Sequence, residues 1–251
     1  MANLLGTSHK VALGEGFGVL TRVLYLSPAS ESGRNLCPSS TEGCRAACLG
    51  HSSGFMVFGT HKAARIAKSR FLQDDRAGFL AQLTREIQAT VRKAKREWLQ
   101  PAIRLNGSSD IGWERIAPEL FAQFPEVHFY DYTKRYERAR RSIVERQTYD
   151  YPVDPRGWPP NYRLTFSRSG ENDAECTNVL ALGGNVAAVF ATTDEFPAEF
   201  VWPDTEGRVT YPVVSGEISD YRYGDPQNVV IALKARGKAL KDHSGFVIRE
   251  H

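Results

Sequence analysis

Three cysteines close together near the start of the chain form its strongest chemical signal. Cys37, Cys44 and Cys48 have the spacing C-x6-C-x3-C, and the residues between them include turn formers such as Pro38 and Gly43. A loop of this kind can direct three thiolates toward one centre. Because cysteine thiolates are the usual ligands of iron–sulfur clusters, the spacing predicts a 4Fe-4S cluster with three protein ligands.

Other interpretations of this loop remain open. His51 follows Cys48 with C-x2-H spacing, so a Cys3His zinc site is an alternative. Free cysteines are also often simply buried. The fourth cysteine, Cys176, would close the cluster if it were a ligand. If Cys176 is instead a buried helix residue, one iron stays open to a small-molecule ligand.

Length and composition indicate a single α/β domain over residues 1–251, with the cysteine loop at 35–51 and a C-terminal part of different character from about residue 193. No apolar run reaches about eighteen residues and no secretory signal begins the chain, so we expect no membrane contact and a cytoplasmic location. In that reducing environment clustered thiols favour metal binding over disulfides.

Positive charge is concentrated in two helical segments, residues 62–96 and 134–146. The first contains ten Lys or Arg against three Asp or Glu, a local charge of +7 in a chain whose net charge is +3. Such a surface can bind nucleic acid through its phosphates. The alternative is an ordinary solvated helix surface.

Apolar strands alternate with helices along most of the chain. Strands are predicted at 19–26, 102–105, 127–132, 162–167, 186–191 and 229–233, and helices at 60–71, 77–98, 113–124, 136–146 and 174–182. Thr60 is the expected N-cap of the first helix, and Trp98 ends the apolar stripe of the second. The order predicts an α/β fold: a partial (β/α) barrel or an open, mostly parallel sheet with outer helices.

Polar loops follow the predicted strands, and in a parallel sheet they meet at one edge. We therefore expect one ligand pocket beside the cluster, formed by side chains after the second and fourth strands: Asn106, Ser108, Ser109, Asp110, Arg168, Ser169 and Asn172. Two structural alternatives remain. Asp110 can cap the helix that follows it, and Asp131 can pair with Lys134.

The cysteine loop and the segments 104–111 and 235–246 resemble a family of bacteriophage gene products with the same C-x6-C-x3-C loop, over nearly the whole chain. This resemblance implies a phage origin and expression in the cytoplasm of an infected bacterium. More distantly, the chain is similar to radical S-adenosylmethionine enzymes, partial barrels in which three cysteines after the first strand hold a 4Fe-4S cluster. Their motif is C-x3-C-x2-C, and their Gly-Gly-Glu sequence after the second strand is replaced here by residues 106–110.

Two function classes follow. The first is an iron–sulfur enzyme, radical-SAM-like or redox, acting on a nucleotide, nucleic acid or protein, with S-adenosylmethionine as the further cofactor that the resemblance implies. The second is a non-enzymatic nucleic-acid-binding protein whose iron–sulfur or Cys3His zinc site is structural.

Overall fold

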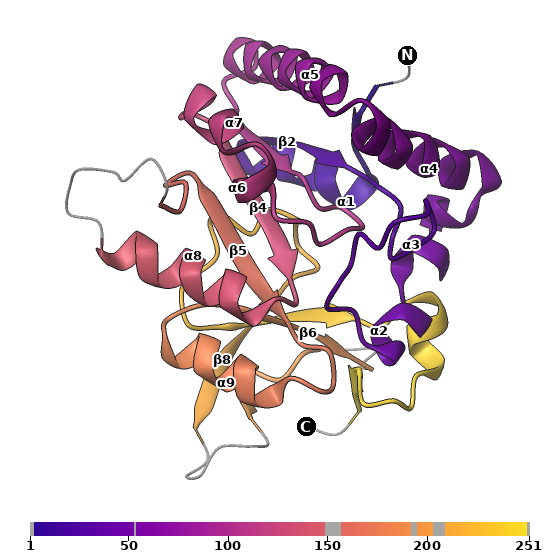
Figure 1. Ribbon diagram of the computed structural model, residues 1–251. Coiled ribbons are helices and arrows are strands. Elements are labelled where there is room, and N and C mark those ends of the chain that lie inside the picture. Colours follow the sequence, from indigo (N-terminus) through magenta and orange to yellow (C-terminus); the bar gives the residue numbers. More distant parts are fainter. Residues whose placement is uncertain (1–2, 53, 149–156, 192–194, 203–208, 250–251) are drawn as a thin grey trace.

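The central feature of the fold is a mostly parallel sheet that does not close into a barrel (Figure 1). The computed structural model describes residues 3–52, 54–148, 157–191, 195–202 and 209–249. Within these residues the strand order is β1-β2-β3-β4-β5-β6-β9-β8-β7, with β10 paired to β6. The predicted α/β class, with an open and mostly parallel sheet and outer helices, is confirmed.

Six central strands lie parallel to one another and carry the apolar segments seen in the sequence. They are β2 (Val19–Leu24), β3 (Gln100–Arg104), β4 (His128–Thr133), β5 (Tyr162–Ser167), β6 (Val186–Phe190) and β9 (Val230–Lys234). Further strands extend the sheet: β1 (Leu5–Gly6), β7 (Glu199–Val201), β8 (Thr210–Ser215) and β10 (Val247–Ile248). Of these, β1 is antiparallel to β2, and β7 is antiparallel to β8.

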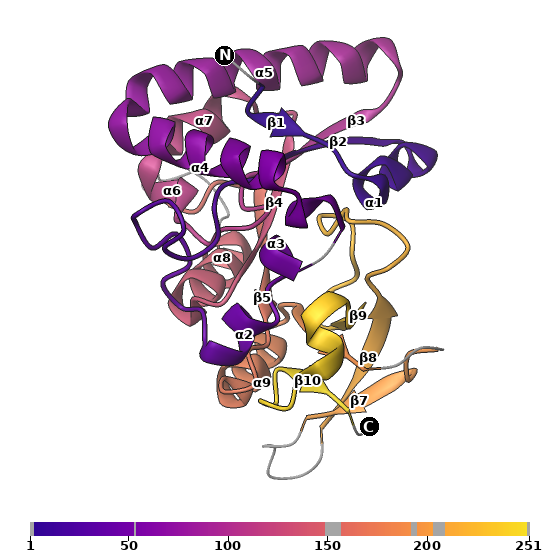
Figure 2. The ribbon, with the colours of Figure 1, turned by 90° about the vertical axis from the view of Figure 1, so that its right-hand side faces the viewer.

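Helices connect the parallel strands, and the longer ones cover one face of the sheet, called here the outer face (Figure 2). The longer ones are α4 (Gly59–Asp74), α5 (Arg76–Arg96), α8 (Tyr136–Thr148) and α9 (Asp173–Ala181). The side chains of Phe79, Leu83 and Ile87 on α5 are fully buried in one core cluster with residues of β2 and β3. Burying each large apolar side chain stabilises the folded state by about 1.5–3 kcal/mol, and these contributions hold the helix against the sheet. No helix of the described part is long and apolar enough to cross a membrane.

Short helical turns occupy several connections. They are α1 (His9–Ala12), η1 (Leu13–Phe17), α2 (Glu42–Ala46), α3 (Leu49–Ser52), η2 (Gly54–Val57), α6 (Trp113–Ile116), α7 (Pro118–Gln123) and η3 (Gly237–Lys241). The predicted helix over 113–124 is therefore wrong as one helix. Pro118 disfavours helical backbone at the residue before it, and Ala117 accordingly adopts φ −149° and ψ 62° between α6 and α7.

The prediction that Trp98 ends the buried stripe of its helix is also wrong. Helix α5 ends at Arg96, and Trp98 has a left-handed φ of +57° and is 94% exposed. The Leu99 N–H then donates to the Ala94 carbonyl at 2.9 Å, which closes the helix end. The left-handed residue directs the indole away from the core. Nor is Thr60 an N-cap, since α4 begins at Gly59 after Phe58.

Two segments lie partly outside the described residues, the proline-rich segment 151–160 and the acidic segment 193–210. Within the described part of the second, residues Glu199–Val201 form β7, which pairs with β8. β7 has only three residues, too few for an alternating pattern to appear in the sequence.

Candidate functional site

The cysteine loop, residues 35–51, lies between β2 and α4, and several hydrogen bonds hold it in place. Thr41 caps α2: its side-chain oxygen accepts a hydrogen bond from the Cys44 N–H at 3.2 Å, and its hydroxyl donates to the Ser169 carbonyl at 3.3 Å. The Cys37 N–H donates to Asn35 Oδ1 at 2.9 Å. These bonds fix the loop against the connection that follows β5.

The C-terminal segment supports the loop from the other side. Ala47 lies in one buried cluster with Ala235, Ala239 and Val247, and Figure 2 shows this segment (yellow) beside α2 and α3. A Cβ atom at Gly43 would lie 2.1 Å from the Ser244 hydroxyl oxygen, so only glycine fits between α2 and this segment. The segment after β9 therefore belongs structurally to the cysteine site.

All three cysteines line one cavity of about 160 Å³ at the carboxyl edge of the sheet. A single water needs only about 10–15 Å³ on this measure, so the cavity has room for a much larger group. Four of the predicted ligand-pocket residues line it together with the cysteines: Asn106, Ser108, Ser109 and Asp110. The structure thus brings the cysteine loop and the loop after β3 together, as the parallel sheet predicted.

The three thiols lie in each other's electrostatic field. Burial, helped by the neighbouring Cys48 and Cys44, raises the pKa of Cys37 to about 11, although a hydrogen bond from the Ala29 N–H opposes the rise. Burial and Cys44 likewise raise the pKa of Cys48. Without a cation the cavity therefore favours neutral thiols, whereas a bound metal cation would favour thiolates and release their protons.

The described residues contain no group of three or more His, Cys, Asp or Glu side chains that could hold a metal ion. In a four-iron cluster each cysteine binds a different iron atom, so such a cluster needs no common point of contact for the sulfurs. The side chain of His51 lies outside the described part, and the Cys3His zinc site stays a prediction. The donor set is three free thiols that line one cavity.

The loop after β3 is held by its own hydrogen bonds. The Asn106 N–H donates to Asp131 Oδ1 at 2.6 Å, and the Ser109 hydroxyl donates to Asn106 Oδ1 at 2.9 Å. A Cβ at Gly107 would lie 2.6 Å from Val23 Cγ1, so the close approach to β2 requires glycine. Ser108 contacts the chain just after β2 and the cysteine loop: its hydroxyl donates to the Leu26 carbonyl, and its own carbonyl lies 3.7 Å from the Cys37 sulfur.

Asp110 does not cap a helix, which makes that alternative wrong. The residue before α6 is Gly112, which makes no side-chain cap. The Asp110 carboxylate instead accepts from the Thr133 hydroxyl at 2.8 Å and the Lys134 N–H at 2.9 Å, and pairs with Arg138 at 3.1 Å. It thereby fixes the end of β4 at the cavity wall.

Beneath Asp110 lies a buried charged network centred on Arg138. The guanidinium donates to both oxygens of Glu114 at 2.9–3.1 Å and to the Tyr162 hydroxyl at 2.6 Å. The Tyr162 hydroxyl in turn donates to Asp131 Oδ2 at 2.7 Å. One arginine therefore links the loop after β3, strand β5 and helix α8.

The predicted pairing of Asp131 with Lys134 is wrong. Asp131 is fully buried in the network above, whereas the Lys134 ammonium lies 5.7 Å from the centre of the Phe246 ring and lines the cavity. Strand geometry separates them, since residues three apart point to opposite faces. Within the described residues Lys134 has a cation–π contact and no acidic partner.

Arg168, Ser169 and Asn172 do not line the cavity. Arg168 forms an ion pair with Asp173 at 2.6 Å. Asn172 accepts from the Ser169 N–H at 2.7 Å and donates to the Ser167 carbonyl at 3.1 Å. These three residues shape the neighbouring wall, which contacts the cysteine loop through the Ser169 carbonyl.

Cys176 lies apart from the other three cysteines in the chain's second core cluster. Its side chain is fully buried among Phe166, Val179 and Val186, and its pKa is raised mainly by burial. It does not line the cavity. Its contacts fit a buried helix residue, which leaves three cysteines for a metal.

Further lining residues were missed by the sequence reasoning. Arg104 and Tyr132 line the cavity from the face of the sheet opposite the outer helices, with the guanidinium 4.6 Å from the ring centre. Arg104 also pairs with Asp220 at 2.8 Å.

Comparison with known proteins places this chain in one family. The family model described as gene product 88 matches residues 4–250. The predicted resemblance to a phage gene-product family is thereby confirmed. Searches of curated proteins and of solved structures gave no significant match.

Proposed function

The chain belongs to the gene product 88 family, and we propose that it is an enzyme resembling the radical S-adenosylmethionine enzymes, with a 4Fe-4S cluster on Cys37, Cys44 and Cys48. One observation carries the proposal: three free thiols from a single loop line a cavity at the carboxyl edge of a mostly parallel, open sheet. Chemistry in parallel α/β folds is located at this edge.

A cluster with three cysteine ligands would supply electron transfer and one open iron position for a ligand. The protein's part is to position that ligand. Lys134 offers a positive charge at the cavity wall for an anionic group of the ligand, and the Ser109 hydroxyl oxygen can accept a hydrogen bond there. Asp110 acts indirectly, because its bonds to Thr133 and the Lys134 N–H hold the lysine in place.

Anaerobic reconstitution tests the cluster directly. The full chain, supplied with iron and sulfide, should bind about four of each, turn brown and give an electron paramagnetic resonance signal after reduction. Cys44→Ala should lose most of the iron, whereas the matched control Cys176→Ala should keep it. A colourless protein with stoichiometric zinc would instead support the Cys3His site, and loss of iron in Cys176→Ala would indicate a closed cluster.

The open iron position has its own test. Adding S-adenosylmethionine, or a nucleotide, to the reduced protein should change the resonance signal of the cluster. Asp110→Ala should retain the iron yet lose this change. A cluster that responds to no added ligand would favour a structural or electron-transfer role, and the enzyme proposal would then fail.

A further inference from the structure

A second, smaller pocket lies at the opposite end of the sheet from the cysteine cavity. Strand β5 contributes to both, with Ser167 at the cavity and Arg163 at the pocket. The pocket has a volume of about 30 Å³, enough for a few waters or a small ion. Its polar lining comes mainly from Tyr130, Arg146, Arg163, Thr165, Arg222 and Asp225.

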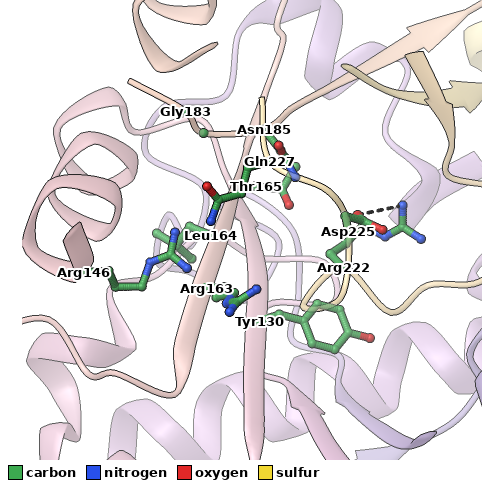
Figure 3. A pocket seen from close by; sticks show the side chains of 11 residues that line it. Tyr130, Arg146, Arg163, Leu164, Thr165, Gly183, Asn185, Arg222, Asp225 and Gln227 are labelled. Carbon is green, nitrogen blue, oxygen red and sulfur yellow. Dashed lines mark ion pairs between the residues drawn. The ribbon is translucent and has the colours of Figure 1, made fainter. Parts of the chain in front are cut away.

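Charge is unbalanced in this pocket. Three lining residues are arginines and one, Asp225, is acidic, which gives the lining a formal charge of +2. Asp225 pairs with Arg222 at 3.2 Å. Figure 3 shows the guanidinium of Arg222 directed to that carboxylate, while those of Arg146 and Arg163 lie near each other. Among the described residues neither of these two has an acidic partner.

Both arginines have N–H groups without a hydrogen-bond partner among the described residues. Arg163 donates to the Tyr223 carbonyl at 2.6 Å, but its Nε is buried without a hydrogen-bond partner in the described structure. Arg146 donates through Nε to the Ser142 carbonyl of its own helix at 2.9 Å, and its terminal nitrogens have no hydrogen-bond partner among the described residues. Burial lowers the pKa of Arg146, and the charge of Arg163 lowers it further. Two like charges held together in a half-buried pocket are unfavourable until an anion joins them.

We propose that this pocket is an oxyanion site, in which Arg146 and Arg163 bind a phosphate group between them. Each planar guanidinium can donate two parallel hydrogen bonds, and a phosphate has enough oxygens to accept from both. Thr165, which also lines the pocket, adds a hydroxyl. The phosphate can come from a small molecule such as pyrophosphate or a nucleotide, or from the backbone of a nucleic acid. The site does not depend on the cysteine cluster.

Binding of inorganic pyrophosphate and of a single-stranded oligonucleotide of about twelve nucleotides to the full chain tests the proposal, by calorimetry at matched ionic strength. Arg146→Gln should weaken the binding at least about tenfold, the usual effect of removing a charged hydrogen-bond donor. The matched control is Arg140→Gln, an exposed arginine on the same helix that pairs with Glu137. Arg163→Lys keeps the charge but removes the fork, and should also weaken binding.

The two ligands distinguish the sources of the phosphate. Tenfold weaker pyrophosphate binding with unchanged oligonucleotide binding supports a small phosphate ligand, and weakening of both supports a nucleic-acid backbone. A wild-type chain that binds neither ligand overturns the proposal. Equal losses in Arg140→Gln and Arg146→Gln overturn it too, because they would indicate only general attraction to basic helices. If Arg146→Gln lowers the melting temperature without ligand, the comparison of Arg163→Lys with wild type decides.

Discussion

Asp131 is a fully buried carboxyl group directly beneath the cavity loop, and its charge should make the stability of the protein depend on pH. It accepts hydrogen bonds from the Asn106 N–H and the Tyr162 hydroxyl at 2.6 and 2.7 Å. Burial nevertheless raises its pKa from 3.8 to about 6, and the hydrogen bonds and Arg138 oppose this only in part. The carboxyl group therefore ionises at lower pH in the unfolded chain than in the folded protein.

Because the unfolded chain ionises at lower pH than the folded protein, the free energy of unfolding falls as the pH rises. Below about pH 3 Asp131 is protonated in both states and does not penalise folding. As the pH rises toward 6, the unfolded chain releases its proton first, so the folded state loses relative stability, and the loss levels off above pH 6. A pKa difference of about 2 corresponds to about 3 kcal/mol of unfolding free energy.

Asp131→Asn removes this titration while keeping the shape of the side chain. Its unfolding free energy minus that of wild type should therefore rise by about 2.4 kcal/mol between pH 4 and pH 7, because part of the effect already lies below pH 4. A pH-independent loss of about 1 kcal/mol is expected from the altered hydrogen bonds. The pKa of Asp225 is also raised to about 6, but that group is present in both proteins and cancels in the difference.

Urea unfolding at pH 4, 5, 6 and 7, followed by circular dichroism, measures this difference. Glu119→Gln is the control, because it removes an exposed carboxylate on α7. A difference between Asp131→Asn and wild type that is constant over this range would refute the reasoning, as would one that falls with pH. Either result would mean that the network compensates the buried charge completely.

Three further predictions concern stability and binding. Arg138→Ala should lower the free energy of unfolding by about 3–5 kcal/mol in urea titrations, since it leaves Glu114 and Asp110 buried without their cation. Trp98→Ser should change it by less than about 0.5 kcal/mol, because the side chain is 94% exposed; a larger loss would mean that the indole packs in solution. If the basic segment 62–96 binds nucleic acid, the affinity of the full chain for DNA should fall steeply with salt, and Arg92→Gln should reduce the slope; an affinity insensitive to salt would contradict this.

Most of the fold could be predicted because each central strand is a short apolar segment bounded by turn or helix signals. The predicted strand 162–167 coincides with β5, and 19–26 differs from β2 only at its end. The edge strands were missed for a physical reason. β1 and β10 have two residues each, too few for alternation to appear, and they are defined by pairing with distant strands.

The candidate site was predictable only where local sequence determines position. Residues 106–110 follow β3 directly, so the topology alone brings them to the cysteine loop. Arg168 has the same relation to β5, yet it is bound by Asp173 and the carbonyl of Gly245, 77 residues further on. Likewise, much of the expected positive charge of segment 134–146 is used internally: Arg138 is buried with Glu114, and Arg141 pairs with Glu145. Partners this distant, or buried, leave no pattern in a single sequence.

The cysteine spacing can be understood from the local structure of the loop. Cys44 lies in α2, and Cys48 follows one helical turn later, with its N–H donating to the Arg45 carbonyl. Residues four apart on a helical path lie on one side, so C-x3-C suits convergence as long as the chain stays helical there. The longer C-x6-C interval contains the turn that ends at the Thr41 cap. A deletion that shortened this interval would remove the cap and its contact with Ser169, and with them the position of the first sulfur relative to the other two.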